Sequence, residues 1–81
     1  MPYIENKNRK QLSSSLPDPS SSGELNYAIC MMINKYLDKT KRSYQNYNDV
    51  IGVLECAKLE IYRRLVSPYE DKKIAKNGDV F

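Results

Sequence analysis

The strongest constraint on the fold of this chain is a run of apolar residues that recur every three or four positions. These residues are Leu25, Ala28, Ile29, Met32, Ile33, Tyr36 and Leu37. Such spacing places them on one side of a helix and leaves polar residues on the other side. Ser21 and Glu24 have the spacing of a capping box at the start of that helix. The sequence therefore predicts a helix over residues 24–39.

A second apolar run predicts a longer helix over residues 47–66, with Asn46 or Asn48 as its cap. Its apolar residues occupy more than one face of the helix: Val50, Ile51, Val53, Leu54, Ala57, Leu59, Ile61, Tyr62, Leu65 and Val66. Because one partner helix cannot cover so wide a surface, we expect burial on two sides. The polar residues between the two runs predict a loop, so that the two helices form an antiparallel hairpin.

The dipeptide Ser67–Pro68 predicts the end of the second helix and the start of a third. Proline cannot continue a helix but suits its first position, and Glu70 has capping-box spacing to Ser67. The third helix is predicted over residues 68–77 and should end at Gly78, which is a common helix stop. Its predicted first turn presents free backbone N–H groups.

Residues 1–23 predict an N-terminal arm and a linker. Pro2 favours an extended start, residues 5–12 are compatible with a short helix, and residues 13–23 are rich in serine and proline. The whole chain, residues 1–81, is then a single small all-α domain. A core of this size supplies only about 3–5 kcal/mol, so the sequence predicts a helical bundle built from a homodimer or a larger homo-oligomer.

Several absences narrow the function. The chain has no histidine, no phosphate-binding loop and only two cysteines, which excludes the histidine-dependent catalytic triads and the usual cysteine–histidine metal sites. We expect no enzymatic activity, no catalytic residue, no metal and no cofactor. Cys30 and Cys56 are expected to be reduced and buried within the helical pattern. No apolar run suits a membrane span, so we expect a cytoplasmic protein with no membrane partner.

The arginine pair Arg63–Arg64 is the main candidate for a binding site. Glu60 precedes it by three and four positions, so ordinary ion pairing on a helix surface is one interpretation. The other is an anion site, in which the guanidinium groups and the start of the third helix hold a phosphate or carboxylate. Tyr62 and Tyr69 lie beside it. The net charge of +3 is small for a protein that binds nucleic acid, so a nucleic-acid partner is not expected.

Five short motifs resemble those of a family of small proteins of unknown function that occurs in bacteria, archaea and phages. The motifs are Gly23–Tyr27, Gly52–Glu55, Tyr62–Arg64, Pro68–Lys72 and Asn77–Val80. The start of the chain, Met1–Ile4, resembles that family as well. The resemblance implies no assigned activity, and no catalytic residue is carried over from it. Its polar positions, Glu24 and Asn26 among them, exceed what a bare helical hairpin requires.

The functional hypothesis is a non-catalytic protein that binds a small anionic, nucleotide-type ligand between its subunits. Small oligomeric phage proteins that sequester nucleotide immune signals are similar in size and type, so we expect a phage-associated role in the host cytoplasm. The expected ligand-binding residues are Arg63, Arg64, Tyr62, Tyr69, Asn26 and Glu24. The alternatives are a protein–protein interaction module that inhibits or regulates a cellular enzyme, and a nucleic-acid-associated regulator.

Overall fold

The computed structural model describes residues 2–81, and these residues form helices without any strand. The elements are α1 (Asn6–Ser13), α2 (Ser22–Thr40), α3 (Tyr44–Ile61), the π-helical segment η1 (Tyr62–Val66) and α4 (Ser67–Asn77). The prediction of an all-α chain is therefore confirmed. The short helix expected near the N-terminus is α1.

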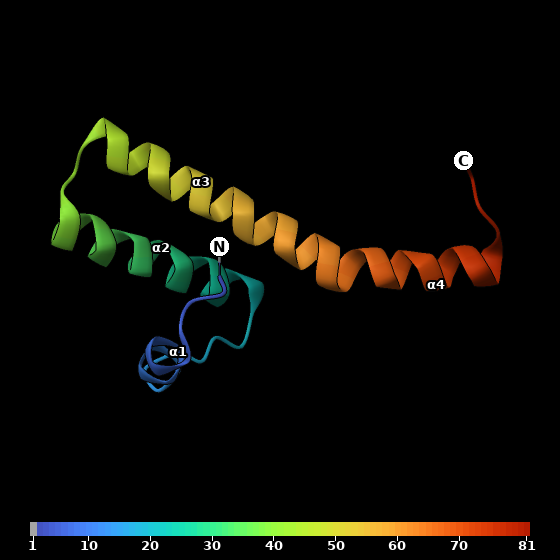
Figure 1. Cartoon of the computed structure of the whole chain (residues 1–81), viewed down its shortest axis with the longest axis horizontal. Helices are drawn as coiled ribbons and strands as arrows, with labels where there is room; N and C mark the ends of the chain where they lie inside the picture. Colours follow the sequence, from blue (N-terminus) through green and yellow to red (C-terminus); the bar gives the residue numbers. More distant parts are fainter. Residues whose placement is uncertain (1) are drawn as a thin grey trace.

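The chain is elongated. Figure 1 shows α2 and α3 side by side and antiparallel, with α4 continuing beyond them and α1 set against the α2 side. The molecule measures 49 × 30 × 28 Å, and its radius of gyration is 16.6 Å. A compact domain of this length has a radius of gyration of about 12 Å. The difference comes from α4, which projects away from the paired helices.

The start of α2 carries the predicted cap. The Ser21 hydroxyl accepts a hydrogen bond from the Glu24 backbone N–H at 3.1 Å. The Glu24 carboxylate in turn accepts from the Ser20 N–H at 3.4 Å and from the Ser21 hydroxyl at 3.3 Å. The first of these bonds satisfies a backbone donor that the first turn of a helix leaves free, and the other two hold the Glu24 carboxylate against the residues before the helix. They also fix the point at which the linker enters α2.

Replacing Ser21 with alanine should lower the stability of the chain by about 1 kcal/mol, because the Glu24 N–H loses its acceptor. Thermal unfolding followed by circular dichroism should show a decrease of roughly 4–8 °C in Tm for a domain of this size. Ser20→Ala is the matched control, since only the backbone N–H of Ser20 takes part in the cap. Equal effects of the two substitutions would contradict this role for the Ser21 hydroxyl.

The connection between α2 and α3 is shorter than the sequence predicted. It consists of residues 41–43, because the Ser43 hydroxyl caps α3 by accepting from the Asn46 N–H at 3.2 Å. The proposed caps Asn46 and Asn48 lie inside the helix instead. Tyr44 and Tyr47, expected in or beside a loop, occupy the first turns of α3.

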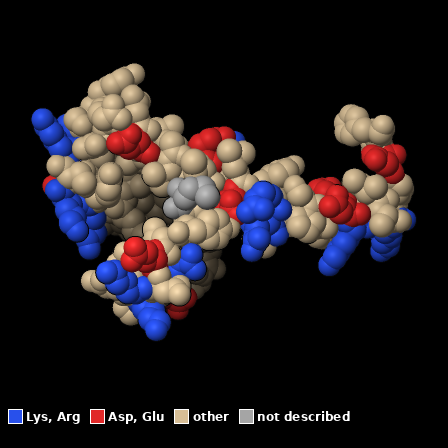
Figure 2. All heavy atoms as spheres, viewed as in Figure 1, with Lys and Arg blue, Asp and Glu red and all other residues tan. Residues whose placement is uncertain are grey.

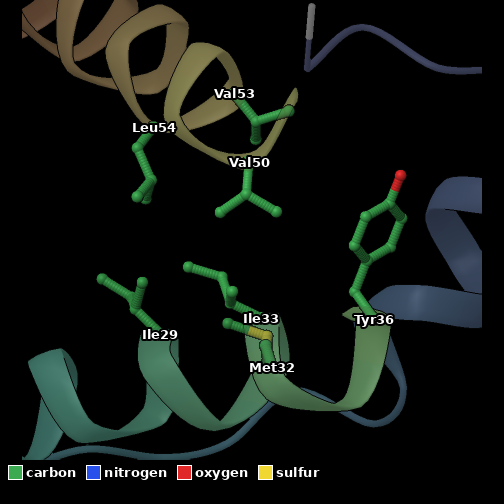
Figure 3. A pocket seen from close by; sticks show the side chains of 7 residues that line it. All are labelled: Ile29, Met32, Ile33, Tyr36, Val50, Val53 and Leu54. Carbon is green, nitrogen blue, oxygen red and sulfur yellow. The ribbon is translucent and has the colours of Figure 1, made fainter. Parts of the chain in front are cut away.

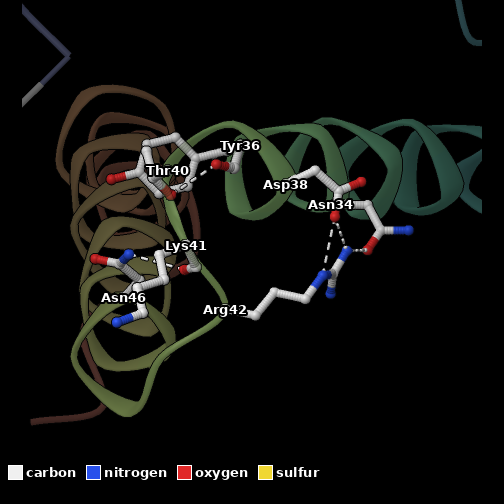
Figure 4. Close-up of polar contacts among 7 residues, drawn as sticks. All are labelled: Asn34, Tyr36, Asp38, Thr40, Lys41, Arg42 and Asn46. Carbon is white, nitrogen blue, oxygen red and sulfur yellow. Dashed lines mark hydrogen bonds and ion pairs between the residues drawn. The ribbon is translucent and has the colours of Figure 1, made fainter.

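Side chains at both helix ends hold this turn in place (Figure 4). The Arg42 guanidinium donates to Asp38 at 2.6 Å and to Asn34 at 2.8 Å. The Asn46 amide donates to the Lys41 carbonyl at 2.8 Å. These bonds tie the end of α2 to the start of α3, so the three-residue turn has a defined geometry.

The predicted helix break at Ser67–Pro68 is wrong. Ile61, Tyr62, Val66 and Ser67 all have right-handed helical dihedral angles, and no side chain caps α4. The Ser67 N–H bonds to the Tyr62 carbonyl, which is the five-residue spacing of a π turn. Since Pro68 lacks an N–H group and its ring crowds the preceding turn, the wider π turn lets the helix pass through the proline.

The helix that begins at Tyr44 therefore continues through η1 to Asn77. It ends where the sequence predicted, at Gly78, which has a φ of +92° and donates to the Ile74 carbonyl at 2.8 Å. This left-handed φ suits glycine because glycine has no Cβ atom.

The core of a single chain is very small. Leu37, at 8% exposure, is the only buried apolar residue among those described. Side chains from α2 and α3 face each other across a cavity of about 350 Å³ (Figure 3). The cavity is lined by Ile29, Met32, Ile33, Tyr36, Val50, Val53 and Leu54. The total accessible surface is 7454 Å², whereas a compact monomer of this mass exposes about 5,000 Å².

Both cysteines are exposed in the chain, which contradicts the prediction that they are buried. The reason is that α2 and α3 each cover only one side of the other. The helical pattern alone did not show which apolar-looking positions lie on the uncovered sides.

We expect Cys30 and Cys56 to react with a bulky thiol reagent in the native protein at rates near those of a free thiol. Following the release of thionitrobenzoate from an aromatic disulfide reagent measures these rates directly. The denatured chain provides the reference rate. If labelling required denaturant, the cysteines would lie in an interface that a single chain does not show.

Candidate anion-binding site

The predicted site residues fall into two groups in the structure. Tyr62, Arg63 and Arg64 belong to η1, and Tyr69 lies one to two turns later in α4. They occupy the part of the long helix where α4 leaves the paired helices. Figure 2 shows basic side chains next to acidic ones in this region of the visible face. A π-helical segment is rare and occurs frequently at functional sites.

Glu24 and Asn26 form the second group, near the start of α2. The Glu24 carboxylate is used in the helix cap. In the described part of the chain, no hydrogen bond or ion pair joins Glu24 or Asn26 to the residues of η1 and α4. The structure therefore does not bring the two groups together within one chain.

Arg63 pairs with the glutamate three positions before it. Its guanidinium lies 2.6 Å from the Glu60 carboxylate. The Tyr3 hydroxyl donates to the same carboxylate oxygen. These two hydrogen bonds, first from Tyr3 and then from Arg63, hold the pKa of Glu60 below its ordinary value. The pKa of Arg63 is raised in turn, chiefly by its hydrogen bond to Glu60.

The contact of Tyr3 with Glu60 joins two segments that are 57 residues apart in the chain. Arg9 supports it from α1, because its guanidinium carbon lies 6.0 Å from the centre of the Tyr3 ring and its Nε donates to the Ile4 carbonyl at 2.6 Å. The N-terminal arm is thus fastened beside η1. Tyr3 and Glu60 were not among the predicted site residues, although Tyr3 lies in the start that resembles the family.

Arg64 differs from Arg63. It is exposed and forms no ion pair with any described residue. Its guanidinium keeps all of its N–H donors for a bidentate contact with a phosphate or carboxylate. Of the two arginines, Arg64 can therefore bind an anion without first giving up a partner.

The two tyrosines of the candidate site present exposed rings. Tyr62 and Tyr69 are each 56% exposed. The Lys73 ammonium lies 5.5 Å from the centre of the Tyr69 ring, which is within cation–π distance. A ligand that stacks on Tyr69 would therefore also meet a second positive charge.

One expected part of the site is absent. Because α3, η1 and α4 form one continuous helix, the backbone N–H groups at the start of α4 are not free donors for an anion. The prediction of a helix N-terminus beside the arginines is wrong for this reason. Any anion bound here must be held by side chains.

The cavities of a single chain lie elsewhere. One cavity of about 840 Å³ lies between α2 and the end of α1 together with the segment after it, and it is lined mainly by apolar side chains, including Leu12, Leu16, Tyr27 and Met31. Neither it nor the two cavities of about 350 Å³ is lined by Tyr62, Arg63, Arg64 or Tyr69. None of these three cavities therefore includes the candidate anion site. Among the described residues, no cluster of three metal-binding side chains occurs.

The arm should detach from η1 when Glu60 is protonated. Since its pKa in the folded state lies below the unfolded value, the contact contributes fully above the unfolded pKa and is lost as the pH falls through the folded one. The Glu60 side-chain carboxyl signal, followed by NMR from pH 7 to about pH 3, should shift with a low midpoint, and the amide signals of the arm should shift with it. Tyr3→Phe should move the midpoint of the Glu60 carboxyl signal upward, because that carboxylate loses a hydrogen-bond donor. Glu55→Gln is the control. This substitution should change neither the midpoint of the Glu60 titration nor the signals of the arm at neutral pH.

No helix of the described chain has the length and apolar character needed to cross a membrane. Comparisons with curated proteins and with solved structures found no match. A comparison with protein families gave one match, which covers residues 1–80 and therefore nearly all of the chain. The chain thus belongs to the family described as a domain of unknown function, DUF6899.

Proposed function

We propose that this protein is a non-catalytic binding protein that assembles into a homo-oligomer and holds a small anionic, nucleotide-type ligand between its subunits. The observation that carries the proposal is the apolar surface that a single chain leaves uncovered. The ligand class follows from the arginines and tyrosines that lie next to that surface.

Assembly is supported by the amount and the kind of exposed surface. The chain exposes roughly 2,400 Å² more than a compact monomer of its mass. This excess includes large apolar side chains that a soluble monomer rarely displays together, such as Ile51 and Leu65, which are 66% and 67% exposed. A standard interface covers about 800 Å² on each partner. The excess is therefore enough for more than one interface.

The choice of an anionic ligand is supported by Arg64, which has no ion-pair partner among the described residues. A guanidinium binds phosphate with two parallel hydrogen bonds. Tyr62 and Tyr69 supply exposed aromatic surface nearby for a base or a ribose. In an assembly, Asn26 and Glu24 of another copy complete the site with hydrogen bonds to the sugar or base.

In this proposal the protein is phage-associated, and it sequesters a nucleotide signal of the host's immune response in the host cytoplasm. Such a task needs binding and no turnover. The absence of histidine from the sequence agrees with a site that carries out no proton transfer near neutral pH.

Thermal-shift measurements with a panel of anions test the proposed function. The panel consists of a mononucleotide, a cyclic dinucleotide, ADP-ribose and inorganic phosphate. A ligand present at 100 times its Kd should stabilise the protein by about 2.7 kcal/mol, and at least one nucleotide should do so while phosphate does not. If no nucleotide raises Tm at millimolar concentration, the nucleotide site is excluded.

A second function is favoured by the projecting helix. α4 approaches no helix other than η1 within its own chain, and Ile74, Val80 and Phe81 are exposed on and after it. This end of the molecule suits a module that docks on a cellular enzyme. Capture of a defined partner that is lost on substitution of Ile74 with aspartate, with no stabilisation by any nucleotide, would favour this function over the first.

A further inference from the structure

The α1–α2 cavity, of about 840 Å³, is lined by the end of α1, the segment that follows α1 and one side of α2. Figure 1 shows α1 set against α2. Pockets that bind small organic molecules usually have volumes of about 300–1,000 Å³ and a mostly apolar lining with a few polar groups. The α1–α2 cavity has both properties.

Four of the lining residues follow one another along α2 at intervals of four positions. They are Tyr27, Met31, Lys35 and Lys39. From the first to the last, the cavity follows the helix for about 18 Å. The cavity is therefore apolar toward the start of α2 and positively charged toward the end of α2.

The two lysines of the cavity have no acidic partner in the described part of the chain. Neither Lys35 nor Lys39 belongs to an ion pair there, and no aspartate or glutamate lines the cavity. Asp38, which lies between them in the sequence, is paired with Arg42. The cavity thus combines two positive charges with apolar walls, and an anion with an apolar body complements both features.

The dipole of α2 accounts for only one of these lysines. Lys39 lies in the last turn of α2, where a positive charge is favourable without any ligand. Lys35 lies one turn earlier, beyond the reach of that effect. A lysine at the border of an apolar surface packs its methylene groups along the surface and keeps its ammonium group at the edge. This is the arrangement that holds the charged head of a ligand whose apolar part fills the cavity.

We infer that the α1–α2 cavity binds a small carboxylate with an apolar chain, of the fatty-acid type. Lys35 and Lys39 hold the carboxylate, which has one oxygen for each ammonium group. Leu12, Leu16 and Met31 cover the chain. This site is separate from the proposed nucleotide site, because no residue of η1 or α4 lines the cavity.

Isothermal titration calorimetry of the full chain with decanoate, decanol and acetate tests the inference. Decanoate has both the charge and the apolar chain, decanol lacks the charge, and acetate lacks the long chain. Decanoate should bind saturably and at least about tenfold more tightly than either of the others. The reason is that a hydrogen bond to a charged group and the burial of an apolar chain each change Kd by about tenfold or more.

Substitutions in the cavity should weaken the binding of decanoate. Lys35→Gln and Lys39→Gln each remove one charge and should raise Kd by about tenfold. Lys41→Gln is the matched control, because Lys41 is exposed just after α2 and does not line the cavity. Its Kd should stay within about twofold of the unsubstituted protein. Leu16→Asn should raise Kd as well without loss of helix content, since Leu16 lies outside the helices.

Other outcomes of these experiments would overturn the inference. Equal affinity for decanol and decanoate would show that the lysines take no part in binding. Equal losses in the Lys35, Lys39 and Lys41 variants would show a response to net charge alone. An absence of saturable binding at millimolar decanoate, or a loss of helix content when decanoate is added, would show that the cavity holds no ligand of this type. None of these results depends on whether the protein binds a nucleotide.

Discussion

Replacing Leu65 with aspartate should separate the assembly into monomers. Leu65 is 67% exposed in the single chain and lies in η1, within the apolar surface that a single chain leaves uncovered. Burial of a leucine side chain contributes about 1.5–3 kcal/mol, and the substitution also places a carboxylate in an apolar contact. We therefore expect association to weaken by at least about a hundredfold, which is roughly 2.7 kcal/mol. Sedimentation equilibrium measures this change.

Cys56→Asp is the matched control for that experiment. Cys56 lies nine residues before Leu65, which places it on nearly the opposite side of the helix, and it is exposed. The control adds the same charge to the same helix, on the side away from Leu65. Association should stay within about twofold of the unsubstituted protein, an estimate based on the small effect of surface substitutions. If both variants weakened association equally, the effect would reflect charge alone and not the Leu65 contact.

Replacing Arg64 with alanine should abolish most of the affinity for a nucleotide ligand. A hydrogen bond to a charged group contributes about 1.5–3 kcal/mol, so Kd should rise roughly 10- to 150-fold. Tm in the absence of ligand should change little, because Arg64 forms no ion pair with the described residues. Isothermal titration calorimetry with the nucleotide that gives the largest thermal shift measures the change in Kd.

Two other arginines provide comparisons. Arg42→Ala removes an equal charge at the far end of the paired helices, where Arg42 bonds to Asp38 and Asn34, and should leave ligand affinity unchanged. Arg63→Ala should weaken binding and should also loosen the N-terminal arm, because the Glu60 carboxylate loses one of its two donors. Equal losses in the Arg42 and Arg64 variants would show that only net charge matters and would contradict a specific site.

The features that the sequence predicted correctly depend only on residues that are close to one another in the sequence. The cap formed by Ser21 and Glu24 needs only residues three positions apart, and the stop at Gly78 needs only a residue that tolerates a positive φ. The helical pattern over α2 likewise reflects a local period. Each of these features has one local conformation of low energy, and contacts with the rest of the chain do not change it.

The errors in the prediction arose where two local preferences competed. At Ser67–Pro68, a new cap and a widened turn both accommodate the proline, and the structure adopts the π turn, with the Ser67 N–H bonded to Tyr62. At the start of α3, the sequence predicted Asn46 or Asn48 as the cap, but the Ser43 hydroxyl forms it. Residue preferences alone do not decide between such alternatives.

Features that depend on distant contacts could not be predicted from the sequence. The hydrogen bond of Tyr3 to Glu60 joins the N-terminal arm to the end of α3, and no local pattern connects these two segments. The exposure of Cys30 and Cys56 depends on which sides of α2 and α3 face each other. The candidate site shows the same division: the sequence identified Arg63, Arg64 and the nearby Glu60, but not which arginine pairs with that carboxylate.

Assembly into a homo-oligomer is the central prediction for a chain whose own core contains so few buried residues. Light scattering coupled to size-exclusion chromatography, at micromolar concentration and neutral pH, tests it most directly. We predict a mass that is an integral multiple, two or higher, of the 9.4 kDa chain. A single species of 9.4 kDa that retains the helix content of the structure would contradict the account.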